Sequence, residues 1–469
     1  MMRDVVVIGG GVSGLATGHS LMAQGYDVVV LERQVRPGGN AISDRFDGWL
    51  MEHGPTTLNA AFLPPDSVVN ATGLDRHAVP LGDGVQRRYL RDGDGLSGIG
   101  IGPLGFFRSD YLSPRAKLSM FGEMLRPRRR DGSEESLYDF AARRFGGEFA
   151  ERVIEPMAAG IFMGDARRLT VEGAFPRLVD MEARFGSITR AVLASKLNRG
   201  VEPGRKLFSW REGIGALPAR LAEGLGASLQ TGVTVTSVRR GPDGFDIRTA
   251  THGDLRARTV VLAVPAHVAA ELCETLDPEC AEAIHGIETP PVAVAFLGYR
   301  RDQVAHPLDG LGFLSTRKPG QIVSGVQFCS TMFPGRTPEG HVSIAAYVGG
   351  RRAPEAARRP GAELIADVVA ELSPLLGLSG DPVVSRVRHW AQGLPQYEHG
   401  HAGRRAVVLA TPERVPGLWV TGNFLGGVSV TSCLEQAGQT AKALARHLRE
   451  QDQECPAVPI LKKKPQPGY

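Results

Sequence analysis

The chain has 469 residues, more than one simple hydrophobic core accommodates, so two or three domains are expected. Its net charge is only +4, with 54 basic and 50 acidic residues, and this weak balance argues against a nucleic-acid partner. The five cysteines show neither metal-ligand nor disulfide spacing, which indicates a reducing cytoplasmic compartment and no metal site. The first residues lack the long apolar region of a signal peptide, and no window approaches the roughly 18 apolar residues of a membrane-spanning helix.

Residues 3–32 predict one βαβ unit. The run Val5–Ile8 is uninterruptedly apolar, which is typical of a parallel strand that is buried on both faces. A helical pattern follows over residues 15–24 and ends at Gly25. A second apolar strand is expected over residues 26–31.

The turn of this unit carries the spacing G-x-G-x-x-G. The first glycine permits the tight turn, the second lets the backbone approach a pyrophosphate, and the third packs the helix on the strand. The helix N-terminus offers free N–H groups to phosphate, and an acidic residue about 20 positions further on suits a ribose hydroxyl. The nucleotide-binding residues expected here are Gly9, Gly11, Val12, Ser13, Gly14, Glu32 and Arg33.

The rest of the chain divides into a helical stretch and two groups of strands. Residues 108–198 carry mostly helical patterns, and residues 362–376 and 429–450 predict two further helices. The tail from residue 451 is expected to be flexible. Strands are expected over 229–238, 244–249, 259–265, 292–300, 311–315, 322–328, 342–349, 405–410 and 417–422.

Three further stretches decide between kinds of nucleotide. Arg36-Pro37-Gly38-Gly39-Asn40 follows the βαβ unit, and Glu52-His53-Gly54-Pro55-Thr56 comes next. Near the C-terminus, a strand ending at Gly422 is followed by a helix that opens at Gly426-Gly427-Val428-Ser429-Val430. These stretches resemble the flavin amine oxidase superfamily. The resemblance implies FAD, bound non-covalently because no attachment motif is present. The further cofactor residues that it implies are Gly39, Asn40, Gly54, Pro55, Thr56, Thr57, Val235, Asn423, Val428, Ser429 and Val430.

The expected fold is α/β, with a discontinuous Rossmann-like FAD-binding domain, a mainly antiparallel substrate-binding sheet and a helical insertion. The boundaries expected are 1–80, 205–290 and 402–450 for the FAD-binding domain, 81–105 and 291–401 for the substrate-binding domain, 106–204 for the helical domain and 451–469 for the tail.

Local stretches narrow the resemblance further. Gln86-Arg87-Arg88-Tyr89-Leu90 and Ala159-Gly160-Ile161-Phe162-Met163-Gly164-Asp165 resemble the oxygen-dependent protoporphyrinogen and coproporphyrinogen oxidase family, as does Pro395-Gln396-Tyr397-Glu398-His399-Gly400-His401. The resemblance spans about residues 3 to 450. It implies that Arg88 faces a propionate, whose two oxygens suit the paired donors of a guanidinium. It also implies that the Gly160 carbonyl accepts from pyrrole N–H groups, and that Leu311, Leu314 and Tyr347 sandwich the macrocycle.

The implied reaction is removal of six electrons from a porphyrinogen in three hydride transfers to FAD, with O2 as the final acceptor. No protein acid or base is required, so no catalytic side chain is assigned. The sequence does not separate protoporphyrinogen IX from coproporphyrinogen III, which differ by vinyl and propionate groups. An amine oxidase, a carotenoid or polyprenoid desaturase of the same superfamily, and a non-catalytic flavin-binding scaffold remain alternatives.

The helical insertion gives a prediction about where in the cell the protein lies. Its Phe106, Phe107, Leu112, Phe121 and Leu125 lie near Arg126 and Arg128–Arg130, a combination that suits an anionic membrane surface. The resemblance implies a peripheral position on the inner face of the cytoplasmic membrane. A solvated run of charges is the alternative interpretation, and a homodimer also stays open.

Overall fold

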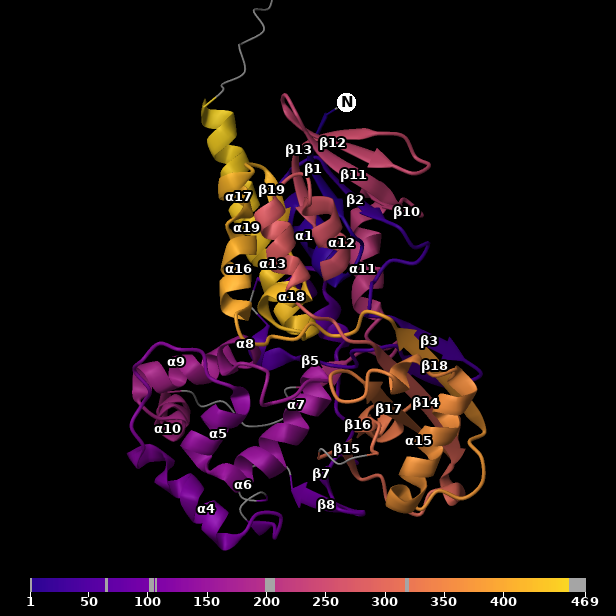
Figure 1. Ribbon diagram of the computed structural model, residues 1–469. Coiled ribbons are helices and arrows are strands. Elements are labelled where there is room, and N and C mark those ends of the chain that lie inside the picture. Colours follow the sequence, from indigo (N-terminus) through magenta and orange to yellow (C-terminus); the bar gives the residue numbers. More distant parts are fainter. Residues whose placement is uncertain are drawn as a thin grey trace, which may run out of the picture.

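The protein is described here by a computed structural model, which covers residues 2–63, 66–100, 105, 108–198, 207–316 and 320–454. Three groups of elements make up the molecule: a sheet flanked by helices at the top of Figure 1, a helical group at the lower left, and a second sheet at the lower right. The fold is therefore α/β, as expected. Phe106, Phe107 and residues 455–469 of the tail lie outside the described residues.

The first sheet gathers strands from three separate stretches of the chain. Its strands run in the order β10-β2-β1-β13-β12-β11, and β19 also pairs with β13. All pairings are parallel except those that join β11, β12 and β13. The bounds are β1 (Met2–Ile8), β2 (Val28–Glu32), β10 (Leu229–Thr231), β11 (Val235–Gly241), β12 (Gly244–Thr249), β13 (Leu255–Leu262) and β19 (Leu418–Val420).

Both faces of this sheet are covered, which explains the uninterrupted apolar run of β1. Val5 and Val7 enter a core formed with α1 (Val12–Met22), α11 (Ala216–Leu225) and α19 (Val430–Glu454). Val6 and Ile8 enter a second core formed with α12 (Ala266–Cys273) and α13 (Pro278–His285). Alternate side chains of a strand point to opposite faces, so a strand buried on both faces needs apolar residues throughout.

The second sheet is mainly antiparallel, as expected. Its order is β18-β14-β17-β16-β15-β7-β8, and only β15 and β7 pair in parallel. Helix α15 (Gly361–Leu376) lays Leu364, Val368 and Leu372 on one face of it. The bounds are β7 (Arg87–Asp92), β8 (Gly95–Gly100), β14 (Val292–Arg300), β15 (Gly310–Leu314), β16 (Val323–Gln327), β17 (His341–Gly349) and β18 (Val384–Trp390).

The helical group surrounds a fully buried ion pair between Glu123 and Arg144. Hydrogen bonds from Ser187 and the backbone at Ile188 complete the shell of the carboxylate. No helix within the described ranges has the length and apolar character needed to cross a bilayer. The elements are α4 (Pro114–Phe121), η3 (Gly122–Leu125), α5 (Leu137–Phe145), α6 (Gly147–Phe149), η4 (Ala150–Ile154), α7 (Glu155–Phe162), α8 (Val171–Ala174), α9 (Pro176–Phe185) and α10 (Ile188–Asn198).

Short elements connect these groups. Strands β3 (Ser43–Phe46) and β4 (Trp49–Glu52) form a hairpin, and β5 (Leu58–Asn59), β9 (Leu207–Ser209) and β6 (Val79–Pro80) form a small sheet. The short helices are η1 (Ala60–Phe62), α2 (Val68–Ala71), η2 (Leu74–His77), η5 (Gly226–Ser228), η6 (Arg301–Gln303), α14 (Cys329–Met332), η7 (Ala356–Arg358), α16 (His401–Leu409), α17 (Thr411–Arg414) and α18 (Asn423–Gly426).

Two predicted strands need correction. The strand expected over 405–410 is wrong, because these residues belong mostly to α16, which buries His401 and Val408 seven positions apart. A short apolar run fits a helix and a strand equally well, so periodicity alone could not decide here. The strand expected over 229–238 is divided into β10 and β11, because Gly232 turns the chain with φ 74°.

Candidate cofactor and substrate site

A cavity of about 450 Å³ lies where the three groups of elements meet. Its walls come from the β1–α1 turn, residues 38–41 and 54–57, the end of α7, the second sheet and the start of α19. Most of the predicted site residues therefore come together. Those that line the cavity are Gly11, Val12, Ser13, Gly39, Asn40, Gly54, Pro55, Thr56, Thr57, Gly160, Leu314, Tyr347, Asn423, Val428, Ser429 and Val430.

The β1–α1 turn has the properties that a pyrophosphate requires. A methyl group at Gly11 would meet only the Gly39 Cα, at 3.8 Å, so the glycine faces open space. No side chain caps the amino end of α1, which leaves its first N–H groups directed at the cavity. Backbone donors and the helix dipole together attract phosphate, so these residues fit the pyrophosphate of FAD.

The remaining residues of the motif lie behind the cavity wall. A Cβ at Gly14 would stand 1.9 Å from the Gly9 carbonyl oxygen, so this glycine serves close packing, as the motif predicts. Glu32 accepts hydrogen bonds from the Gly10 N–H at 2.6 Å and the Gln34 N–H at 2.8 Å. The Val233 N–H donates to the Glu32 carbonyl, which brings the start of β11 and Val235 to the same end of the sheet. The roles of Glu32 and Val235 toward the adenosine half, and that of the exposed Arg33, stay predictions.

A second helix N-terminus faces the same cavity. Ser429 caps α19 by accepting the Ser432 N–H at 3.0 Å, while Val428 and Val430 stand in the wall. Cys433, one turn further on, also lines the cavity, and burial raises the pKa of its thiol to about 11. This thiol is therefore protonated near neutral pH.

The substrate side of the cavity is built by close contact between α7 and β15. A Cβ at Gly160 would stand 2.2 Å from Leu314 Cδ2, so a larger residue here would displace the Leu314 side chain. Across the cavity, the Tyr347 hydroxyl lies 3.0 Å from Gln327 Oε1 and 3.2 Å from the Gly54 carbonyl oxygen. Burial raises the pKa of Tyr347 well above its usual value, so the phenol stays neutral.

Two predicted substrate residues, Arg88 and Leu311, do not line this cavity. Alternation along β7 places Arg88 on the face of Leu90, which packs in the same cluster as Leu314. The side chain of Arg88 makes no ion pair or hydrogen bond to any residue that the structure describes, whereas that of the adjacent Arg87 pairs with Asp309 at 3.4 Å. Partial desolvation lowers the pKa of the Arg88 guanidinium, although Arg88 remains solvent-exposed.

Several lining residues escaped the sequence analysis. His267 lies in the first turn of α12, and Thr289 and Gln392 lie in connections, and none of the three belongs to a recognisable motif. Met163 follows directly on Gly160-Ile161-Phe162 and has φ 51°, a left-handed conformation that is uncommon outside glycine. Met163 had a sequence signal, namely its place within a recognised stretch.

The described lining contains no lysine, arginine, aspartate or glutamate. Its titratable side chains are those of His267, Tyr347 and Cys433. A neutral, largely apolar wall suits a flat apolar molecule held against a cofactor.

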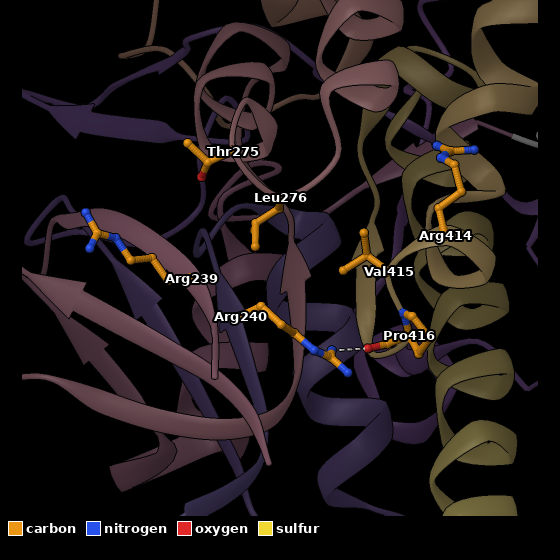
Figure 2. Close-up of a pocket in the computed structure, with 7 residues that line it drawn as sticks. All are labelled: Arg239, Arg240, Thr275, Leu276, Arg414, Val415 and Pro416. Atoms are coloured by element: carbon orange, nitrogen blue, oxygen red, sulfur yellow. Dashed lines mark hydrogen bonds between the residues drawn. The ribbon is translucent and has the colours of Figure 1, made fainter. Parts of the chain in front are cut away.

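A second recess, shown in Figure 2, lies beside β11 and differs from the neutral cavity because arginine side chains line it. Its lining residues are Arg239, Arg240, Thr275, Leu276, Arg414, Val415 and Pro416. Arg240 donates to the Pro416 carbonyl, and Arg414 pairs with Asp277 at 2.8 Å, so both guanidinium groups are already bound. None of the predicted site residues contributes to it.

A dinucleotide cradle that opens directly into a neutral cavity beneath a second sheet defines a flavin-dependent oxidoreductase. Residues 12–445 match the family of flavin containing amine oxidoreductases, and the chain belongs to that family. FAD is accordingly its cofactor, bound non-covalently.

The chain is similar to its relatives over nearly its whole length. The chain is 30% identical to the chloroplastic protoporphyrinogen oxidase of Oryza sativa subsp. japonica, over 95% of this chain and 88% of the relative. It is 24% identical to the coproporphyrinogen III oxidase of Bacillus subtilis (strain 168), over 92% of this chain and 96% of the relative. A solved structure from Exiguobacterium sp. 255-15 has a TM-score of 0.81 at 23% identity, over 96% of this chain and 100% of that one.

Proposed function

We propose that this protein oxidises a porphyrinogen to the porphyrin. The observation that carries the proposal is the neutral cavity, which joins the FAD cradle at Gly11 and Gly39 to the Gly160–Leu314 contact. Two kinds of relative support it, since they are named protoporphyrinogen oxidase and coproporphyrinogen III oxidase. When bound, FAD supplies acceptance of a hydride.

The chain's own residues position the substrate and exclude water. Gly160 lies in the last turn of α7, where backbone carbonyls no longer find partners within the helix. These carbonyls, at the negative end of the helix dipole, suit the inward-pointing N–H groups of a tetrapyrrole. Leu314 and Tyr347 then flank the ring. The described lining offers no carboxylate or amine, and its titratable side chains are those of His267, Tyr347 and Cys433, so no protein base is assigned and the released protons pass to solvent.

Arg88 supplies the carboxylate-binding group. Its side chain has no described partner, and it lies on the sheet face shared by Leu90 and Leu314. A propionate extending from the cavity along that face would pair with the guanidinium through two parallel hydrogen bonds.

The neutral wall also favours one substrate over the other. Coproporphyrinogen III carries a propionate on every ring, whereas protoporphyrinogen IX has vinyl groups on two rings. A carboxylate buried without a partner is costly. We infer that protoporphyrinogen IX, whose carboxylates lie along one edge, is the better substrate.

The test is an aerobic assay of porphyrin fluorescence with both porphyrinogens and two variants. Arg88→Leu should raise the KM by about 10- to 100-fold, the value of a hydrogen bond to a charged group. Arg87→Leu is the control, because Arg87 is the neighbouring arginine but pairs with Asp309. Equal effects of the two substitutions, or no porphyrin from either substrate, would contradict the proposal.

We further propose that the protein binds the inner face of the cytoplasmic membrane through α4 and η3. Leu118 and Phe121 in α4 and Leu125 in η3 are 72%, 62% and 85% exposed. Arg128–Arg130 follow directly and are solvent-exposed. Apolar side chains beside basic ones suit an anionic leaflet.

A further inference from the structure

The hydroxyl of Tyr397 closes a short backbone segment beside the cavity. Tyr397 is fully buried in the connection between β18 and α16. Its hydroxyl donates to the Asn423 carbonyl and accepts the Gly427 N–H at 3.1 Å. Burial raises the pKa of Tyr397, so the hydroxyl keeps the proton that it donates. One side chain therefore fixes both ends of residues 423–427.

This segment determines where α19 begins. It joins β19 to α19 and consists of α18 followed by Gly427, whose φ of 128° interrupts any continuous helix. Phe424 and Leu425 anchor one side of the segment in the core of the first sheet. Asn423 lines the cavity at its start, and residues 428–430 line it immediately afterwards.

The aromatic ring of Tyr397 is itself held from the substrate side. It packs edge-on against Phe162 at 6.0 Å between centroids and stacks on His401 at 4.4 Å. The neighbouring Gln396 Nε2 donates to the Phe162 carbonyl at 3.0 Å. Because Phe162 lies two residues after Gly160 in α7, the 396–397 pair ties the segment 423–427 to the opposite wall of the cavity.

We propose that Tyr397 is a positioning residue for the flavin. Its hydroxyl keeps the segment 423–427 in place, so that the N–H groups at the amino end of α19 stay directed into the cavity. A helix N-terminus carries a partial positive charge, and donors arranged in advance stabilise negative charge that develops during a reaction. Tyr397 thereby favours the reduced flavin over the oxidised one. The inference rests on FAD as the family's cofactor and not on the proposed substrate.

The substitution Tyr397→Phe removes the hydroxyl and keeps the ring. We expect the ratio of reduced to oxidised flavin at a fixed potential to fall about tenfold, which is about 30 mV for a two-electron couple. The measurement is an anaerobic titration of the FAD-loaded protein with dithionite against a reference dye. The control is Tyr111→Phe, because Tyr111 is also buried and its hydroxyl donates to the Arg152 carbonyl at 2.7 Å, outside the cavity wall.

Backbone hydrogen exchange provides a second readout. Amides of residues 421–430 should exchange faster in Tyr397→Phe than in the wild type, and at the wild-type rate in Tyr111→Phe. If Tyr397→Phe retains no FAD, the same comparison is made on the FAD-free full-length proteins. A wild-type potential in Tyr397→Phe, or unchanged exchange of this peptide, would overturn the proposal. Neither readout depends on a porphyrinogen.

Discussion

Gly11 and Gly14 lie three residues apart in one turn, yet an added methyl group meets opposite surroundings at the two positions. At Gly11 it would enter the open cavity, 3.8 Å from the nearest protein atom. At Gly14 it would stand 1.9 Å from the Gly9 carbonyl oxygen. One glycine therefore keeps space for a ligand, and the other keeps space for the chain itself.

The substitution Gly11→Ala should preserve the fold and weaken the binding of FAD. The backbone at Gly11, with φ −75° and ψ 178°, accepts alanine. We expect the melting temperature of the FAD-free protein to stay unchanged while FAD binds about 10- to 100-fold less tightly, as overpacking predicts. Gly14→Ala should instead lower the free energy of unfolding by about 3 kcal/mol or more, even without FAD. Calorimetry and FAD titration distinguish the two, and equal behaviour of both variants would contradict this division of roles.

A buried carboxylate lies directly behind the FAD-side wall. Glu52, at the end of β4, accepts from Ser43 Oγ at 2.5 Å, Arg336 Nη1 at 2.9 Å and the Ile214 N–H at 3.0 Å. Burial raises the pKa of Glu52 to about 7, although Arg336 and the hydrogen bonds act in the opposite direction. The cluster joins the β3–β4 hairpin, the loop before α11 and the connection between α14 and β17.

Stability should therefore carry a pH dependence that belongs to Glu52. Because its folded pKa lies above the ordinary 4.5, the native state binds a proton that the unfolded state has lost. The contribution is fully present below pH 4.5 and is lost as the pH rises through about 7. Glu52→Gln should gain a few degrees in melting temperature relative to the wild type across this range. The substitution Glu363→Gln, at an exposed position, serves as control. A difference in melting temperature between wild type and Glu52→Gln that stays constant at all pH values would contradict the prediction.

Motif spacing points to a residue where a backbone requirement sets it. Gly11 could be named in this way, because the second glycine of the motif must let a ligand approach, whereas Gly39 and Gly160 were named through the family resemblance. Thr289 and Gln392 could not be named, because they reach the cavity only through the path of the whole chain. Arg88 was singled out by resemblance alone, and its place outside the cavity lining leaves its role a prediction.

At the level of elements, strands that are buried on both faces were the easiest to predict. Residues Val5–Ile8 of β1 and Val292–Leu297 of β14 are continuous apolar runs, and both strands occur where expected. β18 was missed because Val384–Trp390 alternates arginine with apolar residues, and Arg386 and Arg388 cover Phe46 and Trp390 with their guanidinium groups. Stacked arginines fit a strand, but in sequence they resemble a solvated loop.

The exposed face of α4 and η3 gives a prediction at this level. A triple variant with Leu118, Phe121 and Leu125 replaced by serine should no longer sediment with anionic lipid vesicles, whereas the wild type should. Raising the salt concentration should also release the wild type, because basic residues contribute. Leu409→Ser, at another exposed apolar position in α16, should sediment normally. Vesicle binding by the triple variant at the wild-type level would show that this surface does not bind the membrane.

The molecule as a whole brings together stretches that are far apart in sequence. The first sheet takes β1 and β2 from the start of the chain, β10 to β13 from the middle and β19 from near its end. The sequence predicted this discontinuity, because strand patterns return at 229–238, 259–265 and 417–422, far from the first βαβ unit. The shape of the cavity could not be predicted from the sequence. Three groups of elements form its walls, and only their packing decides which side chains meet (Figure 1).

The most direct measurement mixes the FAD-loaded protein with protoporphyrinogen IX, and separately with coproporphyrinogen III, in the absence of oxygen. We predict that the flavin absorption band bleaches, faster with protoporphyrinogen IX, and that porphyrin fluorescence appears catalytically when air is admitted. An oxidised flavin that neither compound reduces would contradict porphyrinogen oxidation. The protein would then remain a flavin containing amine oxidoreductase with a different substrate.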